Sequence, residues 1–360
     1  GITLSVSQIV KNKTLKKEVI NLKTEFDNLE FISPPKIRID NITETNFKVS
    51  VYNSEKQKYV VHNFVRTKQV NTVSGVENLV TDDVWYPDSI IVDGNTIAQG
   101  NLNFIYMINA IGDKQDENGH VGAGHGCVVT KWIKFYADGT EFDPTTLAEA
   151  LDCSTFSIKY FADCYAINKP ISPAGTNGFP KLDENNNPIV ANQHSLDATY
   201  YADGRIEHRN RLYIKRDDTS FAQCHVAMNS GFRPYFDKVA FPNINEFTLN
   251  RHYIDEENVV AEPIGCDLNI RTTQRVYSNE VTQFGADNYP YMIKNTIINM
   301  DNTKQKNSNL YFYAPVSPNW LKVYMQPIIC TSNPSSDSSL AEVFNNGDVI
   351  DVLVKREVFI

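Results

Sequence analysis

The segment Arg205–Asp218, RIEHRNRLYIKRDD, carries side chains that could bind or transform a charged substrate. Alternate residues of a β-strand share a face, and one face of this segment is mostly apolar. The other face is mostly cationic and phenolic: Arg205, Glu207, Arg209, Arg211, Tyr213 and Lys215. Such groups hold the carboxylates and hydroxyls of acidic polysaccharides. They also supply what a β-elimination needs, which is a cation for the uronate carboxylate and a group that moves a proton. A solvated strand face is the alternative interpretation.

The glycine-rich segment Gly119–Cys127, GHVGAGHGC, precedes a run of strand-forming residues. A dinucleotide or phosphate loop is excluded, because its glycines must lead from a strand into a helix. His120 and His125 offer two metal ligands, and no Asp, Glu or Cys completes a recognisable spacing, so we expect no metal. Two interpretations remain. The segment is a structural turn, or it is a corner whose glycines allow close backbone approach and present His125 to a ligand.

A third group of candidates lies in the segment AQCHVAMN and the turn SGFRPYF after it. Strand alternation predicts that Cys224 and Val226 face the core and that His225 points the other way. The turn carries Arg233 and Tyr235. Together these residues place polar and aromatic groups near the end of a predicted strand.

By role, these candidates form a catalytic set and a substrate-binding set. We expect no cofactor for either. If the protein is an enzyme, the expected catalytic residues are His125, His225 and Tyr213. The expected substrate-binding residues are Arg209, Arg211, Lys215, Arg233 and Tyr235. Motifs for a serine or cysteine nucleophile are absent. Paired carboxylates for glycoside hydrolysis stay open, because that pairing is set in space and not in sequence.

A sheet is needed to position these groups, and the chain after Ser33–Lys36 (SPPK) consists almost entirely of strand-forming segments. A dozen or more segments rich in β-branched and aromatic residues are separated by Asp-Gly, Asn-Gly, Pro and Ser turn signals. Because no helices alternate with them, the pattern predicts antiparallel pairing. We expect an all-β fold in which residues 33–360 form a jelly-roll-like antiparallel β-sandwich.

The tetrapeptide YADG occurs at Tyr136–Gly139 and again at Tyr201–Gly204. In both copies an aromatic strand enters an Asp-Gly turn, which is a strong short-range hairpin signal. We predict that both are hairpin tips of one architecture. The segment Asp143–Leu151 is predicted to form a helical turn, because Pro144 suits a first-turn position.

Apolar residues recur at a heptad spacing near the N-terminus. They are Leu15, Val19, Leu22, Phe26 and Leu29. The clean seam covers about two heptads, which is short of the three or four that are typical of a coiled coil. Residues 1–32 are predicted to be helical, either as the end of a coiled-coil stalk or as a helix packed on its own domain.

Composition narrows the range of partners. Lys and Arg number 34 against 43 Asp and Glu, which gives a net charge of −9. An acidic surface repels phosphate backbones, so nucleic acid is not an expected partner. No apolar stretch approaches the roughly 20 residues that span a bilayer, so we expect no membrane insertion. The six cysteines form no CxxC pair and are expected to be buried free thiols.

The helical N-terminus, the β-rich body, the segments NLNFIYMIN and GHVGAGHGC and the paired YADG hairpins together resemble bacteriophage tail appendages, meaning tail-fibre tips and receptor-binding proteins. This resemblance implies a homotrimer joined by a parallel N-terminal coil and contacts with other tail proteins. It also implies a β-rich domain that grips, and in some members cleaves, host surface glycans. The implied location is the virion tail, acting outside the cell. No family motif assigns a catalytic residue here.

Three functions follow from these patterns. The leading one is a tail-fibre or receptor-binding protein that recognises a host surface polysaccharide or teichoic acid. The second is a polysaccharide-degrading enzyme on the same sandwich, a lyase that uses Arg209, Arg211, Tyr213 and a histidine. The third is a structural baseplate component.

Overall fold

A computed structural model describes the β-rich part of the chain. The chain divides into two units, Gly1–Pro35 and Lys36–Ile360. In the first unit only Lys17 is described, with helical backbone, so the predicted stalk and its coiled coil lie outside the described residues. The described residues are Lys17 and 36–73, 76–99, 105–111, 114–121, 128–166, 181–232, 235–236, 238–241, 250–254, 260–261, 276–285, 289–301, 303–304, 306–313, 320–331 and 341–360.

The first sheet contains 12 strands. They are β1 (Ile37–Thr43), β2 (Asn46–Asn53), β3 (Lys58–Val73), β4 (Val76–Val92), β5 (Asn95–Gln99), β6 (Ile105–Ile111), β7 (Lys114–Val121), β10 (Leu151–Cys153), β14 (Thr219–Phe232), β18 (Val276–Tyr277), β21 (Asn309–Tyr313) and β22 (Trp320–Gln326). Their order is β10-β1-β2-β3-β4-β5-β14-β22-β21-β18, and β6 pairs with β14 and β7.

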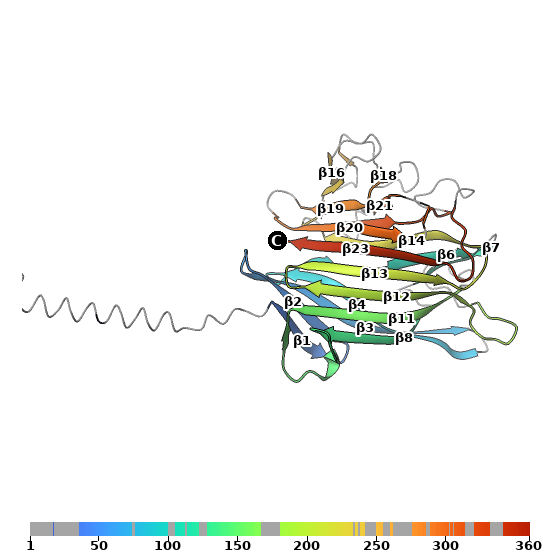
Figure 1. Ribbon diagram of the computed structural model, residues 1–360, viewed down its shortest axis with the longest axis horizontal. Coiled ribbons are helices and arrows are strands. Elements are labelled where there is room, and N and C mark those ends of the chain that lie inside the picture. The colour runs from blue at the N-terminus through green and yellow to red at the C-terminus, as the bar shows by residue number, and fades with distance from the viewer. Residues whose placement is uncertain are drawn as a thin grey trace, which may run out of the picture. The chain divides into compact units, whose positions relative to one another are not determined.

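The second sheet contains 11 strands. They are β8 (Val128–Ala137), β9 (Thr140–Phe142), β11 (Thr155–Tyr165), β12 (Val190–Tyr201), β13 (Arg205–Ile214), β15 (Lys238–Phe241), β16 (Asn250–Ile254), β17 (Val260–Ala261), β19 (Glu280–Phe284), β20 (Met292–Asp301) and β23 (Val349–Phe359). Their order is β17-β16-β15-β19-β20-β23-β13-β12-β11-β8-β9, and Figure 1 looks onto the side-by-side strands of this sheet.

The two sheets pack face to face through a cluster of aromatic side chains. Phe47 of β2 stacks on Phe64 of β3 with ring centroids 4.8 Å apart. From the second sheet, Phe135 and Phe156 meet the Phe47 ring edge-on at 5.4 and 6.0 Å. Every strand pairing in the described part of the chain is antiparallel. The prediction of an all-β antiparallel sandwich is therefore confirmed.

Both YADG segments form hairpin tips, as predicted. Asp138 and Gly139 have φ angles of 46° and 80° between β8 and β9, the left-handed pair that a two-residue hairpin turn requires. Gly204, with φ 89°, closes the hairpin between β12 and β13. The helical turn predicted at Asp143–Leu151 is shorter, a 3-10 helix at Pro144–Thr146.

Four cysteines confirm the expectation of buried free thiols: Cys153, Cys164, Cys224 and Cys330. Burial raises the pKa of the Cys224 thiol to about 12, so this group stays protonated and acts as a small apolar side chain. Cys127 and Cys266 lie outside the described residues.

Strand β14 differs from its predicted alternation. Cys224 and Val226 are buried as expected, but His225 is buried as well, with no exposed surface. Its ring lies 4.8 Å from that of Tyr324 on the paired strand β22, and its Nε2 lies 3.2 Å from Gln223 Oε1. A register shift beside Ala227, whose φ is 53°, also interrupts the strand's regular alternation. The expectation that His225 points away from packed residues is wrong, because this strand is buried on both faces.

A polar chain crosses the core beneath the second sheet. Its members are Tyr160, His194, Asn210 and His208. His194 Nε2 lies 2.9 Å from Asn210 Oδ1, and Asn210 Nδ2 lies 3.0 Å from His208 Nδ1. His208 and Asn210 share the inner face of β13 with Leu212, as alternation predicts. Buried polar groups need such partners, because an unmade hydrogen bond away from water is costly.

The buried imidazoles should make the protein sensitive to acid. Burial lowers the pKa of His62 to about 3 and that of His194 to about 4, from an ordinary 6.5. As the pH falls, the imidazoles of the unfolded chain are therefore protonated at a higher pH than those of the folded protein. Their stability contribution is fully present above pH 6.5 and declines as the pH falls toward 4. Thermal unfolding followed by circular dichroism should give a melting temperature that drops through this range.

A His194→Gln variant is the matched control, since the amide cannot take up a proton. At neutral pH its melting temperature should be lower than that of the parent protein. The melting temperature should then fall less steeply as the pH is lowered. A flat profile for the parent protein across the same pH range would contradict neutral, buried imidazoles.

Candidate functional site

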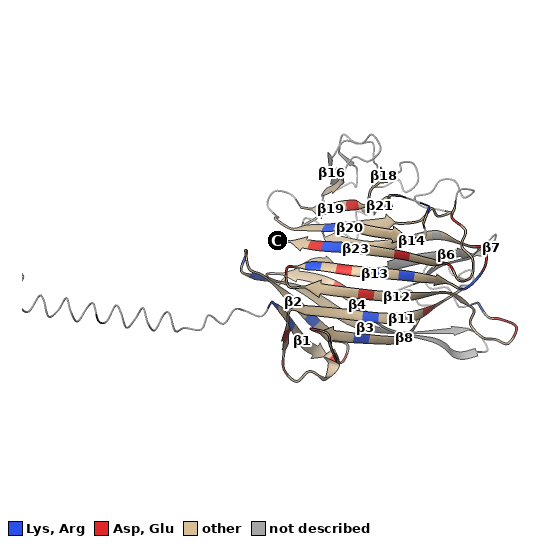
Figure 2. Cartoon of the chain, viewed as in Figure 1, with Lys and Arg blue, Asp and Glu red and all other residues tan. Residues whose placement is uncertain are grey.

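The outer face of the second sheet holds the predicted cationic strand. Arg205, Glu207, Arg209, Arg211 and Tyr213 are all partly exposed along β13, and the residues between them are buried. The predicted alternation is thus confirmed. Figure 2 shows basic and acidic residues spread over the strands of this face.

Strand register places side chains from six strands in one row across this face. Phe161 pairs with Trp132 on one side and with Ser195 on the other. Ser195 pairs with Arg211, Arg211 with Asp351, and Asp351 with Asp301. Directly paired residues of antiparallel strands share a face. We call this set the outer row: Trp132, Phe161, Ser195, Arg211, Asp351 and Asp301.

Aromatic rings form one end of the outer row. Trp132 is 46% exposed and stacks on Phe161 with centroids 6.4 Å apart and planes 15° from parallel. The ring of Tyr213 lies 6.1 Å from that of Phe161. These contacts give three neighbouring rings on the outer face, and the tryptophan ring is open to solvent.

A bulge in β8 helps to present Trp132. The register with β11 shifts between Phe161 and Ala162, so Lys131 is an extra residue next to Trp132. Lys131 Nζ lies 3.3 Å from Asp163 Oδ2, and Gln193 Nε2 donates to Asp163 Oδ1 at 2.8 Å. Polar groups that can donate and accept hydrogen bonds therefore border the rings.

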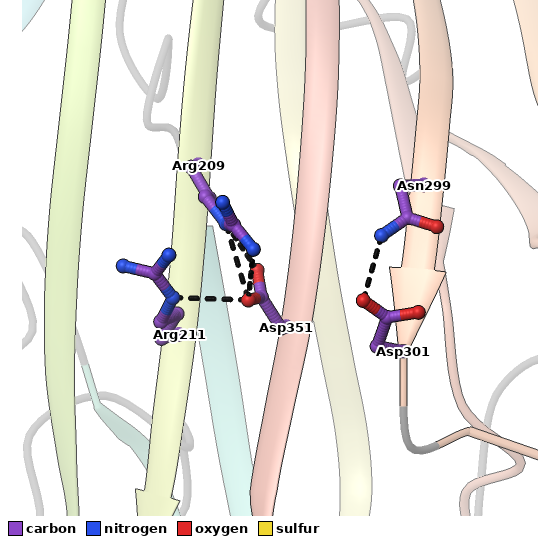
Figure 3. Close-up of polar contacts among 5 residues, drawn as sticks. All are labelled: Arg209, Arg211, Asn299, Asp301 and Asp351. Carbon is purple, nitrogen blue, oxygen red and sulfur yellow. Dashed lines mark hydrogen bonds and ion pairs between the residues drawn. The ribbon is translucent and has the colours of Figure 1, made fainter.

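An ion-pair cluster forms the other half of the outer row (Figure 3). Arg209 Nε and Nη2 donate to the two oxygens of Asp351 at 2.8 and 2.6 Å. Arg211 donates to Asp351 Oδ2 from Nε alone, at 2.9 Å. On the next strand, Asn299 Nδ2 donates to Asp301 Oδ2 at 2.7 Å.

The Asp351 carboxylate stays ionised between its two arginines. Burial by itself raises the pKa of this carboxyl. The hydrogen bonds from Arg209, and then from Arg211, outweigh that effect and hold its pKa below the ordinary 3.8. Asp351 therefore fixes both guanidinium groups over the whole physiological pH range.

The other predicted residues do not all join this face. Lys215 is exposed just beyond the end of β13. Tyr235 contacts Tyr289 and Tyr291 and packs on a cluster that contains Val358. Because Tyr213 pairs with Val349, at the opposite end of β23 from Val358, the two tyrosines are far apart.

Three predicted histidine and arginine positions do not contribute to the described site. His225 is fully buried. His125 and Arg233 lie outside the described residues. In the described part of the chain, no three His, Cys, Asp or Glu side chains gather in a way that could hold a metal ion. The described residues also contain no helix suited to crossing a membrane.

Sequence reasoning missed Trp132, Phe161 and Asp351. The sequence carried a signal for two of these residues. Trp132 alternates with apolar residues in VVTKWIKFYA, and Asp351 is a lone acid between apolar residues in VIDVLV. Neither signal could identify the partners, because those lie on strands distant in the sequence.

A separate cavity of about 620 Å³ lies at the edge of β8. Its lining includes Arg66, Trp85, Lys134, Glu141 and Asp143. Arg66 lies over the buried Trp85 ring at 5.9 Å, and Lys134 Nζ pairs with Glu141 at 3.0 Å. Asp143 accepts a hydrogen bond from the Thr145 backbone N–H, so these lining groups already have partners within the protein, and the outer face offers the better-presented site.

Comparisons with known proteins leave the family open. No protein-family model matches the chain, and no curated protein matches it in sequence. Among solved structures, galactose 1-epimerase from Lactobacillus acidophilus NCFM is similar at 8% identity and a TM-score of 0.35, covering 86% of this chain and 97% of its own.

Two further solved structures span larger proteins. The GH36 α-galactosidase AgaB from Geobacillus stearothermophilus has 10% identity and a TM-score of 0.38, covering 86% of this chain and 41% of its own. Heparan sulfate lyase HepC from Pedobacter heparinus has 7% identity and a TM-score of 0.32, covering 93% and 38%. Scores this low give no information on substrate or mechanism.

The ion-pair cluster generates a stability prediction. Replacing Asp351→Asn removes the charge that both arginines contact and should cost about 1–2 kcal/mol, because the arginines remain partly hydrated. Urea denaturation monitored by fluorescence would measure the loss. Glu141→Gln, which breaks the exposed pair with Lys134, is the control and should change stability very little. An equal effect of the two substitutions would show that Asp351 does not organise the outer face.

Proposed function

We propose that the protein binds a cell-surface polysaccharide along the outer row of the second sheet. The observation that carries the proposal is the solvent-open Trp132 ring stacked on Phe161, in register with polar side chains. Sugar rings present apolar faces that stack on aromatic side chains, and their hydroxyls need hydrogen-bond partners at the edge. Gln193 and Ser195 of β12 and Tyr213 of β13 are partly exposed on the same face and offer such partners.

Single exposed apolar residues are common on proteins and need no function. Trp132 differs because its neighbours on the same face are another ring and several donors and acceptors. A buried stacking pair would serve packing. A pair at the surface, with one ring nearly half exposed, has an open face for a ligand.

The source of the polysaccharide is proposed from the resemblance to phage tail appendages. A receptor-binding protein in a virion tail would meet a host capsule or wall polymer first. A homotrimer joined through a helical stalk and a jelly-roll connection of the sandwich belong to the same proposal. Support for the jelly-roll part comes from the chain's repeated crossing between sheets, for example from β9 to β10 and from β13 to β14.

A lyase is the second candidate, and one observation favours it. Arg211 and Tyr213 lie two residues apart on the same exposed face, so a cation and a phenol could meet one uronate. His225 is too deeply buried to act on a surface-bound polymer. If the protein is a lyase, ultraviolet absorbance from an unsaturated uronate should rise with host polysaccharide and disappear in Tyr213→Phe.

The binding proposal predicts the effect of Trp132→Ala. Removing the exposed ring should weaken binding of host capsule or wall polysaccharide by about tenfold or more, as expected when a stacking contact is lost. Trp132→Phe keeps an aromatic ring, so its loss of affinity should be smaller than that of Trp132→Ala. Isothermal titration or biolayer interferometry measures the affinity, and the melting temperature should change little because nearly half of the Trp132 side chain is already exposed.

Ile298→Ala is the matched control for that experiment. Ile298 is 51% exposed on β20 of the same sheet but is not part of the outer row, so its loss should leave binding unchanged. Equal binding by Trp132→Ala and the parent protein would refute the proposed platform. If no host polysaccharide binds the parent protein at all, a structural role in the tail becomes the better explanation.

A further inference from the structure

The two arginines of the outer face are not equivalent. Arg209 contacts Asp351 with two of its nitrogens and lies in the field of three carboxylates, Asp351, Asp301 and Asp197. In the described part of the chain, the Arg211 side chain makes one hydrogen bond, from Nε to Asp351. Among the described residues, neither Nη atom of Arg211 makes a hydrogen bond. Figure 3 shows these two nitrogens pointing away from Asp351.

Asp351 holds the Arg211 guanidinium in place without blocking its outer edge. The Asp351 side chain is 13% exposed and that of Arg211 is 33% exposed. A guanidinium bound through Nε still presents two parallel N–H groups, which match the two oxygens of a carboxylate or phosphate. The Arg211 side chain is therefore oriented before any ligand arrives.

The aromatic half of the outer row lies close to that edge. Ser195 alone separates Phe161 from Arg211 in the register, which is two strand spacings or roughly 10 Å. Serine is small, so a sugar bound at the aromatic end of the outer row has room to extend a substituent over β12. Tyr213 is the next residue after Arg211 on the same face of β13, so it lies beside the place that such a substituent would occupy.

We infer that Arg211 binds an anionic substituent of the polysaccharide, while Trp132 and Phe161 hold the neighbouring sugar rings. The inference deepens the proposed function and rests on it. A uronate carboxylate and a backbone phosphate share the required chemistry of two oxygens on one anion. Asp351 acts as a positioning residue because it holds Arg211 through Nε, and Arg209 acts on Arg211 only through its own bonds to Asp351.

The test compares an acidic polymer with its neutral counterpart. The probes are polygalacturonate, its carboxyl-reduced form and a glycerol-phosphate teichoic acid. Arg211→Gln should weaken binding of the acidic polymer by about tenfold, in line with a lost charge-assisted pair. It should leave the carboxyl-reduced polymer unaffected. Arg211→Lys keeps the positive charge but loses the paired N–H groups of the guanidinium. Its affinity for the acidic polymer should therefore lie between those of the parent protein and Arg211→Gln. Greater loss on teichoic acid than on polygalacturonate would identify phosphate as the natural anion.

Lys355→Gln supplies the charge-matched control. Lys355 is a partly exposed cation on β23 of the same face, paired with Glu357 at 3.2 Å and outside the outer row. Its replacement should change affinity for every polymer by less than about twofold. A similar loss in Lys355→Gln and Arg211→Gln would reduce the effect to general charge attraction and overturn the inference.

The two proposals fail in different ways. Suppose that Trp132→Ala weakens the binding of both polymers, while Arg211→Gln changes the binding of neither or of both equally. The proposed sugar-binding site at Trp132 then stands, and the anion site at Arg211 is wrong. If Trp132→Ala has no effect on either polymer, both proposals are wrong. If the parent protein binds host polysaccharide but none of the three probes, the anion site is wrong and the platform stands. Melting curves for each variant check that the sheet is intact, which the surface position of both residues leads us to expect.

Discussion

Antiparallel register through β8, β11, β12, β13, β23 and β20 is the constraint on which the site depends. Each strand presents alternate residues to the two faces, and a slip of one residue in any pairing would exchange inside for outside. On β13 the inner face is held by Leu212, His208 and Asn210, which pack or bond in the core. That anchoring fixes Arg209, Arg211 and Tyr213 on the outer face.

Several polar groups in the core are held by hydrogen bonds that cross between strands. Arg356 is nearly fully buried, and its Nε and Nη2 donate to Asn295 Oδ1 and to the Met228 carbonyl, each at 2.9 Å. Burial lowers the pKa of this guanidinium to about 10. Such hydrogen bonds favour one strand register, because a shifted strand would leave the buried groups without partners. They reinforce the register that the apolar packing sets.

On the outer face the same register has a chemical consequence. It brings an aromatic pair from β8 and β11 next to a guanidinium from β13 that an acid from β23 orients. Each of these groups is ordinary when considered alone: an exposed tryptophan, a surface arginine, a partly buried aspartate. Their alignment on one row turns separate surface residues into a surface with an apolar end and a charged end, the combination on which the proposed binding of an acidic polysaccharide rests.

The sequence by itself determined the class of fold, the Asp-Gly hairpins at Asp138 and Gly204, and the two faces of β13. Each depends on contacts or dihedral preferences within a few residues. Tertiary structure alone decided that Asp351 lies against Arg209 and Arg211, and that Trp132 and Phe161 join the same row. It also decided that His225 is buried and that Tyr235 lies elsewhere. Those outcomes depend on which strands become neighbours, and Arg211 and Asp351 are 140 residues apart in the chain. Local alternation assigns a side chain to a face, whereas only the completed strand order decides what stands beside it.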